Sequence, residues 1–299
     1  MSKKVVAFFI LLALAAFGAW WLCTAPTAAP QGPRAGGKLR VVTSGYVPYS
    51  LVKQIGGDNI DVQMLVPPGT EPHHFEPTPG SIIAVKEADL FVYTSPAIEP
   101  WAQDILAGLD GVRTLVAGPV EEGQDPHVWM TPYGALAMAR RIAHTLADLD
   151  TPHAAQYRQN LKAFEKEIAA LHRAFQDGLA DCKSRAVVHV GHLAFGELAH
   201  TYDLDLRSLS GTSHQGEHSV KHLAELVRFI RKGQVRAVFT EELVSPELAR
   251  TVAGETGVRV LPLYTVEEVS KRDFEQGKNY LDYMRQNLKN LQEGLQCKA

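Results

Sequence analysis

The chain has 299 residues, of which 45% are hydrophobic and 21% are charged, and its formal net charge at pH 7 is -3. This is an ordinary globular composition with enough apolar residues for a sizeable core. The charge is small and no block of basic residues occurs, which argues against a nucleic-acid partner.

Residues 1–23 predict a secretory signal peptide or an N-terminal membrane anchor. Lys3 and Lys4 precede an uncharged apolar stretch, Val5 to Leu22, that is about long enough to cross a bilayer. The two lysines should stay in the cytoplasm, so the remainder of the chain should lie outside it. We therefore expect a periplasmic or extracytoplasmic protein.

The end of this leader leaves three outcomes open. Cys23 would carry a lipid in a lipoprotein, but Trp20, Trp21 and Leu22 stand where such leaders have small residues. The alternatives are an uncleaved anchor and cleavage further along, near Ala28 and Ala29. Residues 24–37 are rich in proline, alanine and glycine, which predicts a flexible tether.

Residues 38–130 alternate short apolar runs with helical patterns, and we interpret them as an N-terminal α/β lobe. Helices are expected at 49–55 and 81–87. Strands with near-continuous apolar character, separated by helices, predict a buried parallel sheet. The expected strands are LRVVTS (39–44), VQMLVP (62–67), DLFVYTS (89–95) and RTLVAG (113–118).

Residues 181–299 repeat the same alternation, so we predict a C-terminal α/β lobe with its own parallel sheet. The expected strands are RAVVHVG (185–191), LDLRSLS (204–210), VRAVFTE (235–241) and VRVLPLY (258–264). Helices are expected at 193–202, 220–233 and 246–257.

Residues 131–180 form a helical segment between the lobes, with a first helix at 132–149. Residues 151–180 contain no glycine or internal proline before Gly178, and Thr151 and Pro152 suit the N-cap and first helical positions. The second helix would be on the order of 40 Å long and would join the lobes as one stiff strut. Its apolar face recurs at intervals of three and four, through Leu161, Phe164, Ile168, Leu171 and Phe175.

Two cysteines lie in the second half of the chain, Cys182 and Cys297. Outside the cytoplasm such a pair is more often a disulfide than a redox site. A bond between them would tie the C-terminus to the second lobe, provided that the geometry allows it.

Histidines follow three of the expected strands. Ligands bind outside the carboxyl ends of the strands in parallel α/β sheets. His73 and His74 follow the second strand, His127 follows the fourth, and His192 ends the fifth. Imidazoles delivered from separate rigid elements are what a transition metal in a cleft requires. We expect His74 to point away, because adjacent residues of an extended loop face opposite ways.

Other histidines are interpreted as structural or solvated residues. His189 lies mid-strand and should be packed. The segment SGTSHQGEHSVKH places His214 and His218 on the rim of the expected cleft, as a polar loop or as an aid to metal capture. The remaining histidines lie on helical segments: His144, His153, His172, His200 and His222.

The motifs PHHFEPTP, DPHVWMTP and HLAFGELAHTYDL, with the long helix, together resemble the metal-specific class of ABC-transporter solute-binding proteins. Members of that family bind zinc or manganese outside the cell. YLDYMRQNLKNLQEGL (280–295) is similar to the family's C-terminal helix, and the resemblance extends from Lys38 to the end. It implies two α/β lobes joined by one long rigid helix, with the ion in the cleft between them.

The resemblance implies His73, His127 and His192 as three metal ligands. The family's fourth ligand is often an aspartate just after the last strand, but the matching position here is Val266. We expect the adjacent Glu267 to replace it. Alternatives are Glu241, His214, His218 or a water molecule.

The predicted function is zinc capture, with manganese as the alternative metal, and delivery to the permease of an ABC transporter. A monomer attached to the membrane through its leader or anchor is expected. No HExxH motif or nucleophile elbow occurs, so no catalytic residues are assigned. The competing hypotheses are a zinc-dependent hydrolase with an open coordination site and a metal-dependent surface adhesin.

Overall fold

The computed structural model describes residues 37–119, 125–208, 220–233, 235–241 and 246–298. The predicted leader, the lipidation or cleavage sites, most of the tether, and both His214 and His218 lie outside these residues. Within the described ranges, no helix combines the length and apolar character needed to cross a bilayer.

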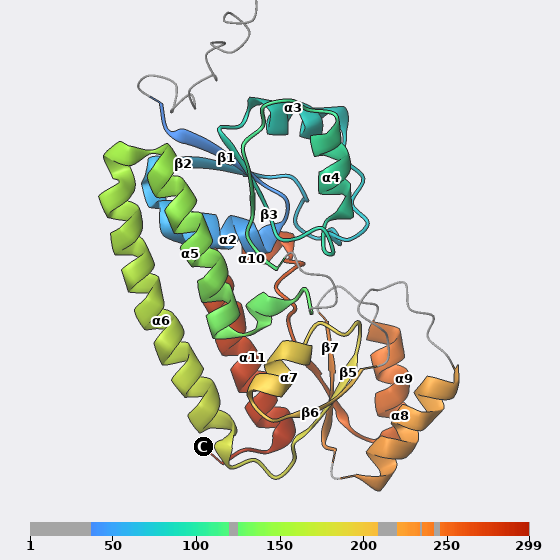
Figure 1. Ribbon diagram of the computed structural model, residues 1–299. Coiled ribbons are helices and arrows are strands. Elements are labelled where there is room, and N and C mark those ends of the chain that lie inside the picture. Colours follow the sequence, from blue (N-terminus) through green and yellow to red (C-terminus); the bar gives the residue numbers. More distant parts are fainter. Residues whose placement is uncertain (1–36, 120–124, 209–219, 234, 242–245, 299) are drawn as a thin grey trace, which may run out of the picture.

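The first sheet has four parallel strands in the order β2-β1-β3-β4. The strands are β1 (Leu39–Thr43), β2 (Ile60–Met64), β3 (Leu90–Tyr93) and β4 (Thr114–Val116). Figure 1 shows this sheet in the upper half of the molecule, with α3 and α4 on one side and α2 on the other. The helices are α2 (Tyr46–Gly56), α3 (Pro79–Glu87) and α4 (Pro100–Ala107), and a 3₁₀ turn, η1 (Gly57–Asn59), follows α2.

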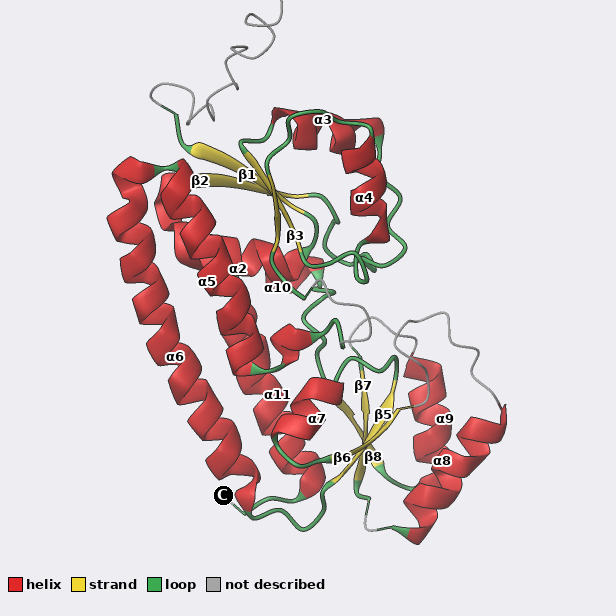
Figure 2. Cartoon of the chain, in the orientation of Figure 1, coloured by secondary structure: helices red, strands yellow, loops and turns green. Residues whose placement is uncertain are grey.

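The second sheet repeats this topology, with parallel strands in the order β6-β5-β7-β8. Figure 2 shows the two sheets as separate layers, one in each lobe. The strands are β5 (Ala186–Val190), β6 (Asp205–Ser208), β7 (Ala237–Thr240) and β8 (Arg259–Pro262). The helices of this half of the chain are α7 (Gly196–Thr201), α8 (Val220–Lys232), α9 (Pro246–Thr256), α10 (Lys271–Glu275) and α11 (Tyr280–Leu295). Of these, α10 lies beside α2 of the first lobe (Figure 1).

Two of the predicted element boundaries are displaced for reasons visible in the backbone. β2 ends at Met64, before the predicted Pro67, although Leu65 and Val66 still donate backbone hydrogen bonds to Thr43 and Ser44. α7 starts at Gly196 rather than at Leu193. Residues 191–195 instead form a turn in which the backbone N–H of Ala194 bonds to the carbonyl of His192. Both displacements leave a loop at the carboxyl end of a strand.

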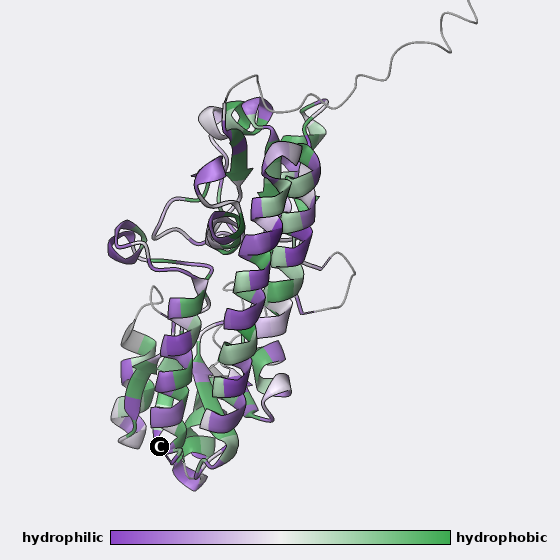
Figure 3. Ribbon diagram, turned by 90° about the vertical axis from the view of Figure 1, so that its left-hand side faces the viewer, coloured by the Kyte–Doolittle hydropathy of each residue, from purple (hydrophilic) through white to green (hydrophobic). Residues whose placement is uncertain are grey.

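A layer of three long helices runs beside both lobes (Figure 1). α5 spans Pro132–Leu149, α6 spans Ala154–Ala180, and α11 lies beside them. At about 1.5 Å per residue the 27-residue α6 is about 40 Å long, as predicted. Figure 3 shows hydrophilic residues recurring along the outward side of this layer. The buried residues of α6 include Tyr157, Phe164, Ile168, Leu171 and Phe175.

The linking helical segment begins at Thr151, as predicted, but its first turn is not α-helical. Residues Thr151–His153 form a separate 3₁₀ turn, η3, and Thr151 does not cap α6 through its side chain. Asp150 organises this corner instead. Its carboxylate accepts a hydrogen bond from the hydroxyl of Tyr157 at 2.5 Å and lies 2.8 Å from Nδ1 of His153.

The chain crosses back to the first lobe after β8. The backbone N–H of Gly69 donates to the carbonyl of Val269 at 2.8 Å, and that of Tyr280 donates to Oγ of Ser50 at 3.0 Å. α11 then returns along α6 to the second lobe. The lobes are therefore held together at their facing edges as well as by the strut.

Cys182 and Cys297 form the predicted disulfide, which closes a sequence separation of 115 residues. The bond joins Cys182, two residues after the end of α6, to Cys297, two residues after the end of α11. Lys298 adds an ion pair to Asp181 at 2.7 Å beside it. The C-terminus is thus fixed to the base of the strut.

Candidate metal centre

Four predicted residues meet between the two sheets, at the carboxyl ends of their strands. His73 follows β2, His127 precedes the 3₁₀ turn η2 (Val128–Met130), His192 follows β5 and Glu267 follows β8. All four are buried, and one ligand atom from each lies within 4.8 Å of the others. The fold therefore brings together residues that are up to 194 positions apart in the sequence.

The spacing of these atoms suits a tetrahedral ion. Glu267 Oε1 lies 3.5 Å from Nε2 of His73 and 3.5 Å from Nε2 of His127, and Oε2 lies 3.3 Å from Nε2 of His192. In a tetrahedron with zinc–ligand bonds of about 2.0 Å, neighbouring ligand atoms lie about 3.3 Å apart. The distances from the carboxylate to the three imidazoles are thus close to those around such an ion.

Several of the converging atoms lack a hydrogen-bond partner within the described part of the chain. These are Nε2 of His73, Nε2 of His127 and Oε1 of Glu267, all inaccessible to solvent. Buried polar atoms are nearly always satisfied, because an unmet hydrogen bond costs about 1–3 kcal/mol. A cation bound by all of them at once would account for their arrangement.

Two carboxylates hold the imidazoles from behind. Oδ1 of Asp125 lies 2.8 Å from Nδ1 of His127 and also accepts the backbone N–H of that residue at 3.0 Å. Oε1 of Glu241 lies 2.9 Å from Nδ1 of His192 and accepts its backbone N–H at 2.8 Å. A carboxylate at Nδ1 places the proton there and leaves the Nε2 lone pair for a metal.

The positions of the carboxylates bear on the candidates for the fourth position. Glu241 had been one candidate for it, but its carboxylate faces Nδ1 of His192, on the side away from the converging Nε2 atoms. Glu267 instead lies beside the Nε2 atoms of all three histidines. The role of Asp125 was not predicted, although the spacing Asp-Pro-His in DPHVW could have indicated it.

The two adjacent histidines have different surroundings. The backbone N–H groups of His73 and His74 donate to the two carboxylate oxygens of Glu71, at 2.8 and 3.1 Å. His73 is buried in the cluster, whereas His74 is exposed and lies outside it. The carbonyl of Pro72 accepts a hydrogen bond from Nε1–H of Trp101 at 2.8 Å, which anchors the loop.

An unusual backbone conformation precedes Glu267. Val266 has φ of 66° and is fully buried. A β-branched residue in the left-handed region is strained by about 1–3 kcal/mol, and such residues are concentrated at functional sites. The turn packs the Val266 side chain into the core and directs the next residue, Glu267, into the cluster.

The charges of the cluster shift the pKa values of its members. Burial lowers the pKa of His192, but the carboxylates of Glu241 and Glu267 outweigh this and raise it to about 10. Burial likewise lowers the pKa of His73, and Glu267 reverses the shift, so the result lies above the usual value. Burial raises the pKa of Glu267, yet His127, His192 and His73 bring it well below its usual range. A metal ion must therefore displace protons from the imidazoles.

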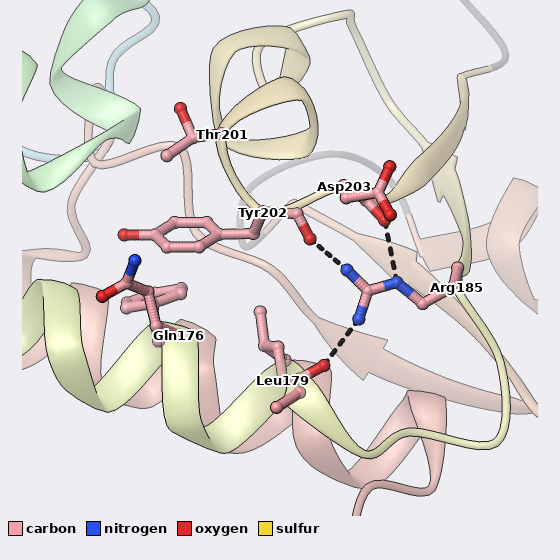
Figure 4. A pocket seen from close by; sticks show the side chains of 8 residues that line it. Gln176, Leu179, Arg185, Thr201, Tyr202 and Asp203 are labelled. Atoms are coloured by element: carbon pink, nitrogen blue, oxygen red, sulfur yellow. Dashed lines mark hydrogen bonds between the residues drawn. The ribbon is translucent and has the colours of Figure 1, made fainter.

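A hollow lies away from the four clustered residues, beside the C-terminal end of α6. It is lined in part by Gln176, Thr201 and Tyr202 (Figure 4). Its volume is about 430 Å³. The guanidinium of Arg185 donates hydrogen bonds to the carbonyls of Leu179, Tyr202 and Asp203. Because these carbonyls take up its donors, Arg185 closes the ends of α6 and α7 rather than offering a site for an anion.

Comparison with known proteins places the chain. Residues 41–294 match the sequence model of the family described as "Zinc-uptake complex component A periplasmic" (ZnuA). The chain belongs to this family. The resemblance drawn from the histidine motifs is thus confirmed.

Individual ZnuA-family relatives cover most of the chain. The "Zinc-binding lipoprotein AdcA" of Streptococcus pneumoniae (strain TIGR4) is 34% identical over 284 residues, which are 87% of this chain and 56% of the relative. The "High-affinity zinc uptake system protein ZnuA" of Bacillus subtilis is 31% identical over 88% of this chain and 90% of its own length. The chain thus spans little more than half the length of its streptococcal AdcA relatives.

Solved structures confirm the predicted two-lobe fold. The Zn(II)-bound ZnuA-like domain of S. pneumoniae AdcA has a TM-score of 0.76 and 32% identity, over 87% of this chain and 99% of that domain. The laminin-binding protein Lmb of Streptococcus agalactiae, described as having adhesin and metal-transporting activity, has a TM-score of 0.78 and 33% identity. The match covers 86% of this chain and 99% of that one.

Proposed function

We propose that this protein captures Zn²⁺ outside the cytoplasm and delivers it to the membrane permease of an ABC transporter. The observation that carries the proposal is the buried cluster of His73, His127, His192 and Glu267, whose ligand atoms all lie within 4.8 Å of one another. Membership of the ZnuA family supports the same function. In this role zinc is cargo rather than a permanent cofactor.

The ligand types favour zinc over manganese. Three imidazoles and a single carboxylate form a borderline donor set, which suits Zn²⁺ in a four-coordinate site. Manganese is harder and prefers more oxygen ligands in a larger coordination shell. Glu267 supplies one carboxylate, while Asp125 and Glu241 are turned to the Nδ1 side of their histidines. We therefore propose Zn²⁺ as the preferred cargo and expect weaker Mn²⁺ binding.

The four proposed ligands come from both lobes and from the segment that joins them. His73 comes from the first lobe, and His192 and Glu267 come from the second. His127 follows β4 and leads into α5, which packs along α6. An ion held between lobes joined by such a stiff helical layer would meet preorganised ligands, which lowers the entropic cost of binding.

Calorimetric titration of the purified protein with Zn²⁺ and Mn²⁺ tests the proposal. We expect one tightly bound Zn²⁺ per chain, and a loss of at least about 100-fold in affinity when His73, His127 or His192 is replaced by alanine. His144→Ala is the matched control, because His144 is exposed on α5 and pairs with Asp148. Unchanged affinity in a triple alanine variant of the three cluster histidines would refute the proposal.

We propose that the protein is not an enzyme. Catalytic zinc sites keep a position open for water, whereas four protein ligands here would fill a tetrahedral shell. A hydrolase would turn over ester or peptide substrates when loaded with zinc, and we expect none above the rate of the His127→Ala variant. The adhesin alternative predicts zinc-dependent retention on immobilised laminin, the ligand named for the S. agalactiae relative.

We also propose that the protein acts as a monomer at the outer face of the cytoplasmic membrane, reached through its N-terminal leader or anchor. All four ligands come from a single chain, so the site requires no second copy. The proposed division is a tether at 24–37, an N-terminal lobe at 38–130, a helical segment at 131–180 and a C-terminal lobe at 181–299. Light scattering of the zinc-loaded protein measures the oligomeric state.

A further inference from the structure

Gly196 lies against one of the carboxylates that hold the metal centre. It is the first residue of α7 and belongs to the motif HLAFGEL, which begins at the proposed ligand His192. A Cβ atom added at Gly196 would lie 2.7 Å from Oδ2 of Asp125. Cβ atoms essentially never approach another atom within 3.0 Å, so only glycine fits here while Asp125 stays in place.

The backbone of Gly196 does not itself require glycine. The described glycines with positive φ lie elsewhere in the chain, and α7 is helical from Gly196 onward. Alanine is a better helix former than glycine. Apart from the chain neighbours and the backbone of α7, Asp125 is the only described residue with atoms within 4 Å of the added Cβ. The requirement for glycine therefore comes from Asp125.

Hydrogen bonds hold the carboxylate of Asp125 in this position. Its Oδ1 accepts the backbone N–H of His127 at 3.0 Å and lies 2.8 Å from Nδ1 of the same residue. The backbone N–H of Glu197, the second residue of α7, also donates to the carboxylate. A methyl group at Gly196 would have to displace Oδ2 and would weaken these hydrogen bonds.

α7 is also held in place, so it cannot easily move away from the carboxylate. Leu198 and Ala199 are at most 5% exposed and pack in the main core. The backbone N–H of Ala194 donates to the carbonyl of His192 at 3.0 Å, which ties the start of the helix to that ligand through one turn. A shift of α7 would therefore move the His192 segment as well.

We propose that Gly196 is a positioning residue of the zinc site: it leaves room for the Asp125 carboxylate to join His127 to α7. The inference rests on the proposed function. The same carboxylate orients the ring of His127 and binds the helix that follows the turn of His192. The centroids of these two rings lie 5.2 Å apart. Displacing the carboxylate would change how the two ligands are placed relative to each other.

The test compares the full chain with four variants. Gly196→Ala adds the methyl group, and Asp125→Ala removes the carboxylate that the methyl group would displace. The double variant Asp125→Ala/Gly196→Ala has the methyl group without the contact. Gly254→Ala is the matched control, because Gly254 also lies in a helix, α9, has no positive φ, and has no atom within 4 Å of an added Cβ.

Zn²⁺ affinities are measured at neutral pH by competition with a chromophoric chelator, and urea titrations establish that each variant is folded. We expect a loss of about 10-fold in Gly196→Ala and about 10–100-fold in Asp125→Ala, the range for groups that orient metal-binding histidines. The double variant should stay within about twofold of Asp125→Ala, because both changes act through one carboxylate. Gly254→Ala should stay within about twofold of wild type.

Proton NMR of the zinc-loaded proteins supplies a readout that a general loss of stability would not move. The Nδ1–H proton of His127 is buried and donates to Asp125, so it should give a downfield resonance that exchanges slowly with water. The resonance that moves in Asp125→Ala should also move in Gly196→Ala and stay unchanged in Gly254→Ala. An unchanged resonance in Gly196→Ala would overturn the inference.

The outcomes separate the inference from the proposed function. Failure of the wild type to bind Zn²⁺ overturns the proposed function. Zinc binding by the wild type, with an equal affinity in Gly196→Ala, overturns only the role of Gly196. A further loss from Asp125→Ala to the double variant, as large as that from wild type to Gly196→Ala, also overturns it, because the methyl group would then act elsewhere.

The double variant decides the matter if Gly196→Ala does not fold. Folding of the double variant with the Zn²⁺ affinity of Asp125→Ala supports the inference, because removal of the carboxylate then relieves the contact. Failure of the double variant to fold, while Asp125→Ala folds, overturns it.

Discussion

The indole Nε1–H of Trp129 donates a hydrogen bond to the carbonyl of Thr265 at 2.9 Å. Trp129 lies two residues after His127, and Thr265 lies two residues before Glu267. The bond therefore fixes the separation of two ligand-bearing segments that are far apart in the sequence. The hydroxyl of Tyr280 also donates a hydrogen bond to the carbonyl of Trp129 at 2.7 Å. Hydrogen bonds to both its side chain and its backbone therefore hold Trp129, in the 3₁₀ turn η2, in place.

Trp129→Phe should weaken zinc binding without removing a ligand. The ring still fills the core, but the Thr265 carbonyl loses its donor, and the strained turn at Val266 loses a restraint. We expect a decrease of about 5-fold in Zn²⁺ affinity, which corresponds to one net hydrogen bond of about 1 kcal/mol. Competition with a chromophoric chelator measures it. Tyr157→Phe is the matched control, since it removes a buried hydrogen bond at the corner between α5 and α6, and equal losses in both variants would contradict a specific role for Trp129.

Asp125→Asn should lower the Zn²⁺ affinity by about 10–100-fold, as is usual for carboxylates that orient metal-binding histidines. The amide can present its nitrogen to Nδ1 of His127, which favours the tautomer that carries the proton on Nε2. Asp205→Asn serves as control, because Asp205 is exposed and pairs with Arg207. An isotherm identical to that of the control would mean that Asp125 does not fix the tautomer.

The pH dependence of the metal-free protein follows from the raised pKa of His192. Protonation of His192 stabilises the folded state fully below about pH 6.5, the pKa of an unfolded histidine, and this contribution disappears as pH rises through about 10. The free energy of unfolding of the metal-free protein should therefore fall across this window. Zinc affinity should change in the opposite sense and rise with pH, because protons compete for the imidazoles. Urea titrations with and without Zn²⁺ at several pH values measure both trends.

The same cluster predicts the behaviour in acid. The pKa of Glu267 is depressed, so its contribution to stability is present above the unfolded value and is lost as pH falls through the folded one. Glu267→Gln should remove this acid-side loss. A variant that keeps the full acid dependence of the wild type would show that other carboxylates dominate.

Much of the site followed from local sequence patterns. Apolar strands ending in histidines indicated the positions of His73, His127 and His192, because parallel sheets present their carboxyl ends to one edge. Glu267 was chosen on its proximity to the position expected for a ligand. The structure adds the reason, since the positive φ of Val266 turns this side chain, and not that of Val266, into the cluster.

The contacts of the buried carboxylates around the cluster could not be predicted from local sequence patterns in the same way. Glu241 reaches His192 across 49 positions of sequence, and this contact depends on the register between β5 and β7. Glu99 meets Ser44 across 55 positions by pairing of β1 with β3. No spacing motif encodes such contacts, whereas Asp125 lies two residues from His127 and carries a local signal.

The disulfide should contribute to stability but not to zinc affinity. Cys182 and Cys297 close a loop with a separation of 115 residues, for which the loss of chain entropy in the unfolded state corresponds to about 4–5 kcal/mol. The bond lies at the C-terminal end of α6, at the far end of the second lobe from the four cluster residues, as Figure 1 shows for the C-terminus.

Cys182→Ser/Cys297→Ser should therefore lower the urea midpoint substantially. The Zn²⁺ isotherm should stay within about twofold of wild type at a temperature where both proteins are folded. Lys298→Ala is the control for the neighbouring exposed ion pair with Asp181, which should contribute little to stability. A large loss of zinc affinity in the serine variant would mean that the base of the strut is coupled to the metal centre through α6 and α11.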